Sequence, residues 1–150
     1  MPSFNNFIQY AVMRECAAVM DRYHSLMRDA SEERTRKVFA IMAGRKNRAL
    51  RRISRLDDKA PPIGKHDAVF TGCMVPPGRT NETLDPRANA LLTARAIEFE
   101  GYCRYISLAH HSRDEGRKRF FLYMVNLHKA ELLFLEKLLR RTGEPSMQYV

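Results

Sequence analysis

The chain of 150 residues carries a formal net charge of +9, and 45% of its residues are hydrophobic and 29% charged. These proportions are typical of one globular domain over residues 1–150 and exclude a disordered chain, and no apolar run reaches the ~18 residues of a bilayer span. The N-terminus lacks the pattern of a signal peptide, and three cysteines without metal-type spacing fit a reducing compartment, so we expect a cytoplasmic protein without a membrane segment.

The first half of the chain contains two stretches in which apolar residues recur at helical spacing. The first stretch predicts a helix over residues 5–27, with Val12 on its apolar stripe. The second predicts a helix over residues 32–56, in which Met42 and Ile53 face inward. The turn between them is short, so the two helices should pack as antiparallel neighbours.

Residues 57–85 differ from both helices, because they hold two Pro-Pro pairs and several glycines and show no sustained period. Two further helices are predicted after this segment, over residues 86–109 and 113–142. So long a connection fits a bundle whose second and third helices run parallel, since the chain must then return along the bundle. We therefore expect an all-α four-helix bundle, built from two antiparallel helical hairpins joined by a long crossover loop.

Start and stop signals mark the ends of the last two predicted helices. Asp85 can cap the third helix, and Pro86 fits its first position, where a missing N–H costs nothing. Ser112 and Glu115 have the spacing of a capping box, which predicts that Ser112 caps the fourth helix. Gly143 is typical of a residue that ends a helix.

Each predicted helix carries a polar residue near the middle of its apolar stripe. These residues are Glu15, Lys46 and Glu98 in the first three helices, and His128 with Glu131 in the fourth. Three carboxylates and an imidazole at similar depth would repel and desolvate one another without a cation. Carboxylates combined with imidazole suit iron and manganese, and bundle interiors hold such sites. The pattern therefore predicts either a bound metal ion or another buried cation.

With these residues the chain resembles the rubrerythrin branch of the ferritin-like superfamily, over about residues 7–139. In "IEFEGYCRYISLA" Glu98 precedes Tyr105 at the spacing of that family, and in "ECAAVMDRYHSLM" Glu15 precedes Tyr23 one residue off it. The resemblance implies an internally duplicated ferritin-like bundle with a non-haem iron or manganese site. Both tyrosines would then donate hydrogen bonds to the buried carboxylates and orient them.

The chain departs from that family at the ligand positions. In "MAGRKNRA" Lys46 stands where the family has a glutamate and Ala49 where it has a histidine. In "MVNLHKAE" His128 and Glu131 occupy the family's glutamate and histidine places in reverse order. The rubredoxin-like module with paired CxxC motifs is absent from the sequence. These departures leave too few ligands for the two irons that peroxide reduction of the rubrerythrin type needs.

Two interpretations of the interior remain, and a third possibility is an active non-haem iron or manganese oxidoreductase. In one, a single iron, manganese or zinc ion is held by Glu98, His128 and Glu131, together with Glu15. In the other, which we favour, no metal binds and the ammonium of Lys46 neutralises the carboxylates, because a lysine beside a divalent cation would be repelled. The main functional expectation is a rubrerythrin-like protein that lacks di-iron peroxidase activity.

The basic charge points to a different class of function. The segment "RKNRALRRISR" predicts a helical binding module for nucleic acid or for an acidic protein partner. It shows no helix-turn-helix or zinc-finger pattern, so any binding of nucleic acid should be non-specific in sequence. The candidate residues are Arg45, Arg48, Arg51 and Arg52.

The predicted fourth helix is apolar on more than one face. Phe120, Leu127 and Phe134 lie outside the stripe assigned to the core. Because apolar residues on a second face usually contact another surface, we expect the bundle to form a homodimer.

Overall fold

The computed structural model describes residues 4–56, 74–75, 85–142 and 148–149. It contains four long helices: α1 (Phe4–Asp29), α2 (Glu33–Ser54), α3 (Pro86–His111) and α4 (Glu115–Arg140). Two short strands, β1 (Met74–Val75) and β2 (Gln148–Tyr149), pair in antiparallel register. The expectation of an all-α protein with four helices is confirmed, and no helix of the described ranges is long and apolar enough to cross a membrane.

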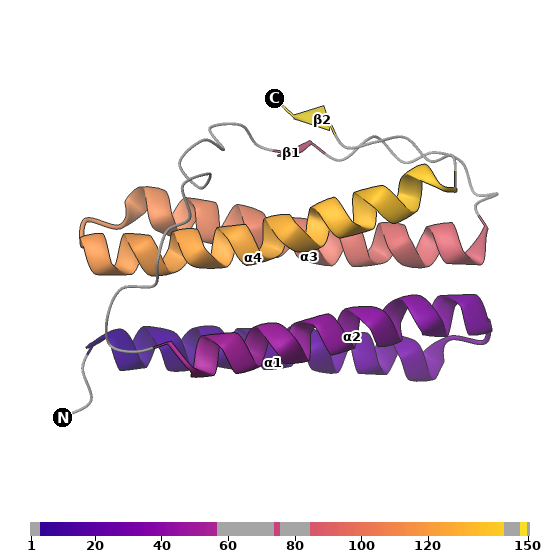
Figure 1. Ribbon diagram of the computed structural model, residues 1–150, viewed down its shortest axis with the longest axis horizontal. Helices are drawn as coiled ribbons and strands as arrows, with labels where there is room; N and C mark the ends of the chain where they lie inside the picture. The colour runs from indigo at the N-terminus through magenta and orange to yellow at the C-terminus, as the bar shows by residue number, and fades with distance from the viewer. Residues whose placement is uncertain (1–3, 57–73, 76–84, 143–147, 150) are drawn as a thin grey trace.

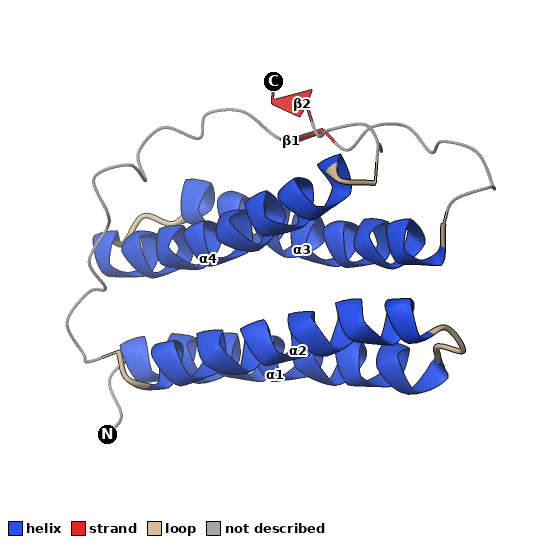
Figure 2. Ribbon diagram, turned by 45° about the vertical axis from the view of Figure 1, so that its right-hand side comes forward, coloured by secondary structure: helices blue, strands red, loops and turns tan. Residues whose placement is uncertain are grey.

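The helices form two layers, each of which is one antiparallel hairpin (Figure 1). α1 packs along α2 in one layer, and α3 packs along α4 in the other. α2 and α3 run in the same direction, and so do α1 and α4; a turned view shows the same two layers (Figure 2). The predicted crossover over residues 57–85 lies, apart from β1 and Asp85, outside the described residues.

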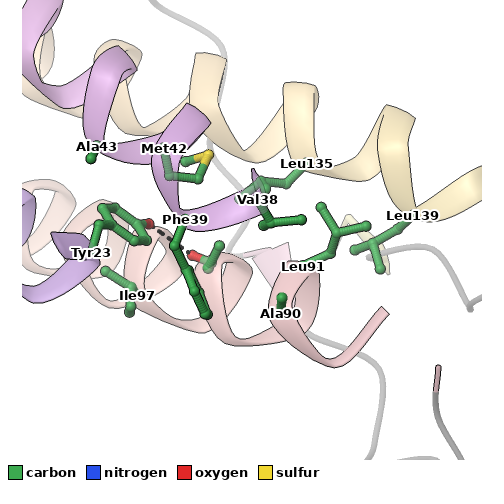
Figure 3. Close-up of a cluster of buried hydrophobic side chains, with 11 residues drawn as sticks. Tyr23, Val38, Phe39, Met42, Ala43, Ala90, Leu91, Ile97, Leu135 and Leu139 are labelled. Carbon is green, nitrogen blue, oxygen red and sulfur yellow. Dashed lines mark hydrogen bonds between the residues drawn. The ribbon is translucent and has the colours of Figure 1, made fainter. Parts of the chain in front are cut away.

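Two apolar clusters fill the space between the layers, one toward each end of the bundle. The cluster nearer the α1–α2 turn is drawn in Figure 3 and includes Tyr23, Phe39 and Leu91. The second cluster, toward the other end, includes Val12 and Ile53. Lys46 and Glu98 lie between the two clusters along α2 and α3, whereas Glu15 and His128 are flanked by residues of the cluster that contains Val12.

The predicted cap of the last helix is wrong. Ser112 ends α3 instead, while Asp114 takes the N-cap position of α4 and accepts a hydrogen bond from the backbone N–H of Arg117 at 2.8 Å. The carboxylate is closer to the first helical turn than the serine, and its negative charge favours a helix N-terminus. Pro86 does begin α3, after Asp85, whose side chain makes no capping bond. Gly143 lies outside the described residues.

The apolar residues that suggested a homodimer are used within the bundle. Phe120 is buried, Leu127 packs partly buried against the cluster that contains Val12, and Phe134 packs against the other cluster. These three side chains therefore give no support for a contact with a second copy, and the homodimer stays a prediction.

Candidate functional site

Glu98 of α3 is the centre of a fully buried polar cluster. Its Oε2 atom lies 2.6 Å from Lys46 Nζ and 2.8 Å from His128 Nδ1, while its Oε1 atom accepts a hydrogen bond of 2.8 Å from the Tyr23 hydroxyl. Glu98 is 0% exposed and Lys46 4%. Tyr23, Lys46 and His128 come from α1, α2 and α4, so this single carboxylate joins all four helices.

A glycine makes room for the imidazole. Gly101 lies one turn after Glu98, and a Cβ atom there would come within 2.3 Å of His128 Cε1. The Tyr105 ring stacks on the imidazole with ring centroids 5.5 Å apart. Two residues of α3 therefore fix the position of a side chain from α4, and any larger residue at position 101 would displace it.

The charges in the cluster follow from opposing effects of burial and pairing. Burial alone raises the pKa of Glu98, but the hydrogen bond from His128 and the charge of Lys46 outweigh it, so the pKa is lowered and the carboxylate is ionised. Burial lowers the pKa of His128, and the nearby Lys46 charge acts in the same direction. The imidazole is therefore neutral, and its Nδ1 carries the proton that it donates to Glu98. The cluster holds one ion pair and no net charge.

Tyr23 takes part as a hydrogen-bond donor. Burial and the adjacent charge of Glu98 both raise the pKa of its hydroxyl, so the phenol keeps its proton. The same hydroxyl lies 3.4 Å from the carbonyl oxygen of Ala94, and Figure 3 draws this contact as the dashed line from Tyr23. The ring itself sits in the apolar cluster with Phe39, which anchors the donor.

Glu15 does not join the cluster. It is half-exposed at the seam between α1 and α3, where it pairs with Arg104 Nη1 at 2.6 Å and accepts a hydrogen bond from the Tyr105 hydroxyl. Arg104 also contacts Glu100 at 3.2 Å, and Arg22 lies 3.9 Å from the same carboxylate. Glu15 thus belongs to a chain of ion pairs along the α1–α3 seam. Arg104 was missed by the sequence analysis, and its only signal was the Glu100–Arg104 spacing of four.

Glu131 is also paired elsewhere. Its Oε2 atom lies 2.5 Å from Arg45 Nε, and the guanidinium of Arg45 sits 3.9 Å above the centroid of the Phe134 ring. Arg45 is half-buried by these contacts, whereas Arg48, Arg51 and Arg52 are exposed. Arg45 therefore differs from the other candidate residues of the basic segment.

The donor set does not fit a metal ion. In the described part of the chain, no three His, Cys, Asp or Glu side chains converge to hold one. Glu98 Oε2 already faces an ammonium at 2.6 Å, and the carboxylates of Glu15 and Glu131 each face a guanidinium. A metal ion at Glu98 would stand next to Lys46. The three carboxylates proposed as ligands lie in three separate ion pairs, and His128 is hydrogen-bonded to one of them.

A cavity of about 60 Å³ lies beside the cluster. Its lining includes Glu15, Cys16, Lys46, Arg104, Tyr105 and His128. The Cys16 thiol faces the backbone carbonyl oxygen of Lys46 at 3.6 Å, and burial raises its pKa. Because the nucleophilic form of cysteine is the thiolate, a buried and protonated thiol is inert. The cavity wall thus contains fixed charges and a protonated thiol, but no activated nucleophile among these six side chains.

Comparison with known proteins adds no assignment: no family model, no curated protein and no solved structure matches this chain. The resemblance to rubrerythrins therefore stays a prediction from the sequence.

Proposed function

We propose that this protein is a rubrerythrin-like bundle whose interior is held by a lysine in place of metal ions, and that it serves as a binding or scaffolding protein without di-iron peroxidase activity. The observation that carries the proposal is the ion pair between Lys46 and Glu98, 2.6 Å long and shielded from solvent at the middle of the bundle. Lys46 stands at a position where the resemblance implies a metal ligand. Its positive charge neutralises Glu98 as a bound metal ion would.

Electrostatics argue against a metal sharing this site. Two unit charges 4 Å apart interact by about 4 kcal/mol at the effective dielectric constant of a protein site, and the repulsion doubles for a divalent ion. Metal binding would therefore require Lys46 to leave Glu98, although the Lys46 side chain is 4% exposed and its ammonium lies 2.6 Å from that carboxylate. The energetic cost of that exchange favours the metal-free protein.

Two structural features support the ferritin-like part of the proposal. α2 and α3 are parallel, as expected for two hairpins joined by a crossover (Figure 1). The hairpins also exchange tyrosine hydrogen bonds: Tyr23 of α1 donates to Glu98 of α3, and Tyr105 of α3 donates to Glu15 of α1. A reciprocal pattern of this kind is what an internal duplication would leave.

The test is a measurement of metal binding by the full chain and by two matched variants. We expect the wild-type protein to take up no stoichiometric iron, manganese or zinc by calorimetry. Lys46→Glu removes the internal cation and adds a carboxylate, so it should gain binding, seen as a Tm that rises with metal concentration. If this variant is unfolded alone, folding on addition of metal reports the same gain.

The control is Arg104→Glu, which makes the same change of charge at the half-exposed pair and should gain no binding. Stoichiometric metal in the wild-type protein that is lost in Glu98→Gln would contradict the proposal. So would turnover of hydrogen peroxide by the wild-type protein that the same substitution abolishes.

A further inference from the structure

The end of the bundle at which α2 finishes carries a dense group of arginines. Arg48, Arg51, Arg52 and Arg55 are all exposed and follow one another within about two helical turns. From Arg34 to Arg55 the sequence contains no Asp or Glu. In the described part of the chain, none of these four guanidinium groups forms an ion pair with a carboxylate.

Exposed aromatic rings lie at the same end. The Gln9 side chain of α1 donates to the carbonyl oxygens of Ile53, at 2.7 Å, and of Leu56, at 3.1 Å, which ties the first turns of α1 to the end of α2. Phe7 and Tyr10, on either side of Gln9, are each 64% exposed. The start of α1 and the finish of α2 appear together at one end of the bundle in Figure 1.

α4 extends this surface. The start of α4 lies at the same end of the bundle as the finish of α2 (Figure 1). α2 and α4 are antiparallel, and Arg45 of α2 pairs with Glu131 of α4. Residues twelve positions earlier on α4, such as the exposed Arg119, therefore come level with the end of α2.

Among the described residues, two at the start of α4 are acidic. Asp114 and Glu115 occupy the N-cap and the first turn of α4, and the Asp114 carboxylate caps the helix. We call the group formed by Arg48, Arg51, Arg52, Arg55 and Arg119, with Phe7 and Tyr10, the basic end.

The chemistry of the basic end matches a polymer with phosphates and exposed bases. The planar guanidinium presents paired N–H donors that fit phosphate oxygens, so an arginine row follows a phosphate backbone. Exposed aromatic rings stack on unpaired bases, whereas the bases of a duplex are already stacked and covered. An anionic membrane would instead favour a continuous apolar helix face, and here the apolar part is two separate rings beside arginines.

We propose that the basic end binds single-stranded nucleic acid, through arginine contacts to phosphates and stacking of bases on Phe7 and Tyr10, without sequence preference. This inference does not depend on whether Lys46 replaces a metal, because the basic end and the buried cluster share no residue.

The experiment measures binding of the full chain to a fluorescein-labelled thymidine 20-mer by anisotropy, between 50 and 300 mM salt. Affinity should fall with salt with a log–log slope of roughly −0.7 for each phosphate contacted. Removing three charges in Arg48→Gln/Arg51→Gln/Arg52→Gln should weaken binding about tenfold or more and reduce the slope by roughly two units.

The matched control is Arg34→Gln/Arg36→Gln/Lys37→Gln, which removes the same charge from exposed positions at the other end of α2. It should weaken binding by less than about threefold, since long-range attraction is screened beyond roughly 10 Å at 0.1 M salt. Equal losses in the two triple variants would overturn the proposal, and so would no binding at 50 mM salt.

The aromatic part has its own test. Phe7→Ala/Tyr10→Ala should weaken binding of the single strand about tenfold or more, because it removes both rings on which bases stack. The same variant should leave binding to a duplex of equal length unchanged. Equal loss for both polymers would overturn the stacking role, and stronger binding to phosphatidylserine vesicles than to the oligonucleotide would overturn the assignment of the partner.

Discussion

Two carboxylates of this bundle have the same kinds of partner in different surroundings. Glu98 and Glu15 each accept a hydrogen bond from a tyrosine of the opposite hairpin, and each pairs with a cation at 2.6 Å. Glu98 is 0% exposed, whereas the Glu15 side chain is 41% exposed. The same short ion pair is thus placed once in the interior and once at the surface.

The difference between the two carboxylates arises from the polar side chains of α2 and α4, the second helix of each hairpin. Lys46 from α2 and His128 from α4 both turn to Glu98, which leaves Glu15 to an arginine of the outer seam. In a symmetric duplicated bundle, each of the two carboxylates would have one hydrogen-bonding partner from α2 or α4. Here both partners serve one carboxylate, because a buried charge needs all of its hydrogen bonds from protein while a half-exposed one also has water.

The largest expected effect comes from removing the two cations in turn. Lys46→Met leaves Glu98 ionised and unpaired in the interior, and we expect it to lower the free energy of unfolding by about 3–5 kcal/mol. Arg104→Met at the half-exposed pair should cost about 0–1 kcal/mol. Urea unfolding of both variants at pH 7 measures the difference.

A double variant separates lost pairing from lost packing. Replacing both partners, in Lys46→Met/Glu98→Leu, should recover most of the loss of Lys46→Met, since apolar groups in place of a buried ion pair are often tolerated. Similar losses for Lys46→Met and Arg104→Met would show that burial does not distinguish the two pairs.

The glycine under the imidazole tests how tightly the interior cluster is built. Gly101→Ala places a Cβ atom against His128, so the ring must move, and we expect a loss of about 1–3 kcal/mol in the free energy of unfolding. Gly44→Ala is the control, because a Cβ atom there meets nothing within 4 Å. In an exposed helix interior that substitution should instead stabilise by about 0.5–1 kcal/mol. A neutral Gly101→Ala would mean that His128 is not fixed.

Much of the fold could be predicted from the sequence, because the helical spacing of apolar residues shows which side of each helix faces the interior of a bundle. The second helix was expected over residues 32–56 and runs from Glu33 to Ser54, and the fourth, expected over 113–142, runs from Glu115 to Arg140. The cap of α4 was missed, since Ser112 and Asp114 both precede the helix and only geometry decides which one reaches an N–H of the first turn.

The grouping of polar residues was less accessible. Helical phase places Glu15, Glu98 and Glu131 on inward faces, but it gives neither depth nor the direction of a long side chain. Arg45 adjoins Lys46 in sequence and reaches Glu131, and Arg104 reaches Glu15 from the next helix of the bundle. Partners of this kind depend on which residues of two helices come level with each other, which is a tertiary property.

A pH series should separate the protonation of His128 from that of Glu98. His128 has a lowered pKa, so the unfolded chain binds its proton first, and stability falls as the pH drops below the ordinary value of 6.5. Glu98 also has a lowered pKa, so its contribution is present above the ordinary value of 4.5 and is lost as the pH falls further, through the lowered value.

At pH 5 the loss of stability should be smaller than in Lys46→Met, because Glu98 is still ionised there and still paired with Lys46. Tm measured from pH 7.5 to pH 5 should fall in the wild-type protein and fall less in His128→Gln, which has no imidazole to protonate. An identical slope in the two proteins would show that His128 does not set the acid response.

Removing one phenolic hydroxyl should have a smaller effect than removing Lys46. Tyr23→Phe takes one hydrogen bond from an ionised and fully buried carboxylate, where such bonds contribute about 1.5–3 kcal/mol. Tyr105→Phe removes the equivalent bond from Glu15, but water reaches that carboxylate and replaces it, so we expect a cost below about 1 kcal/mol. Both substitutions keep the ring and its packing, so the difference between their urea midpoints isolates the effect of burial on the same bond. Equal costs would mean that Glu15 is as dependent on protein donors as Glu98, and the two carboxylates would then be equivalent halves of a duplicated site.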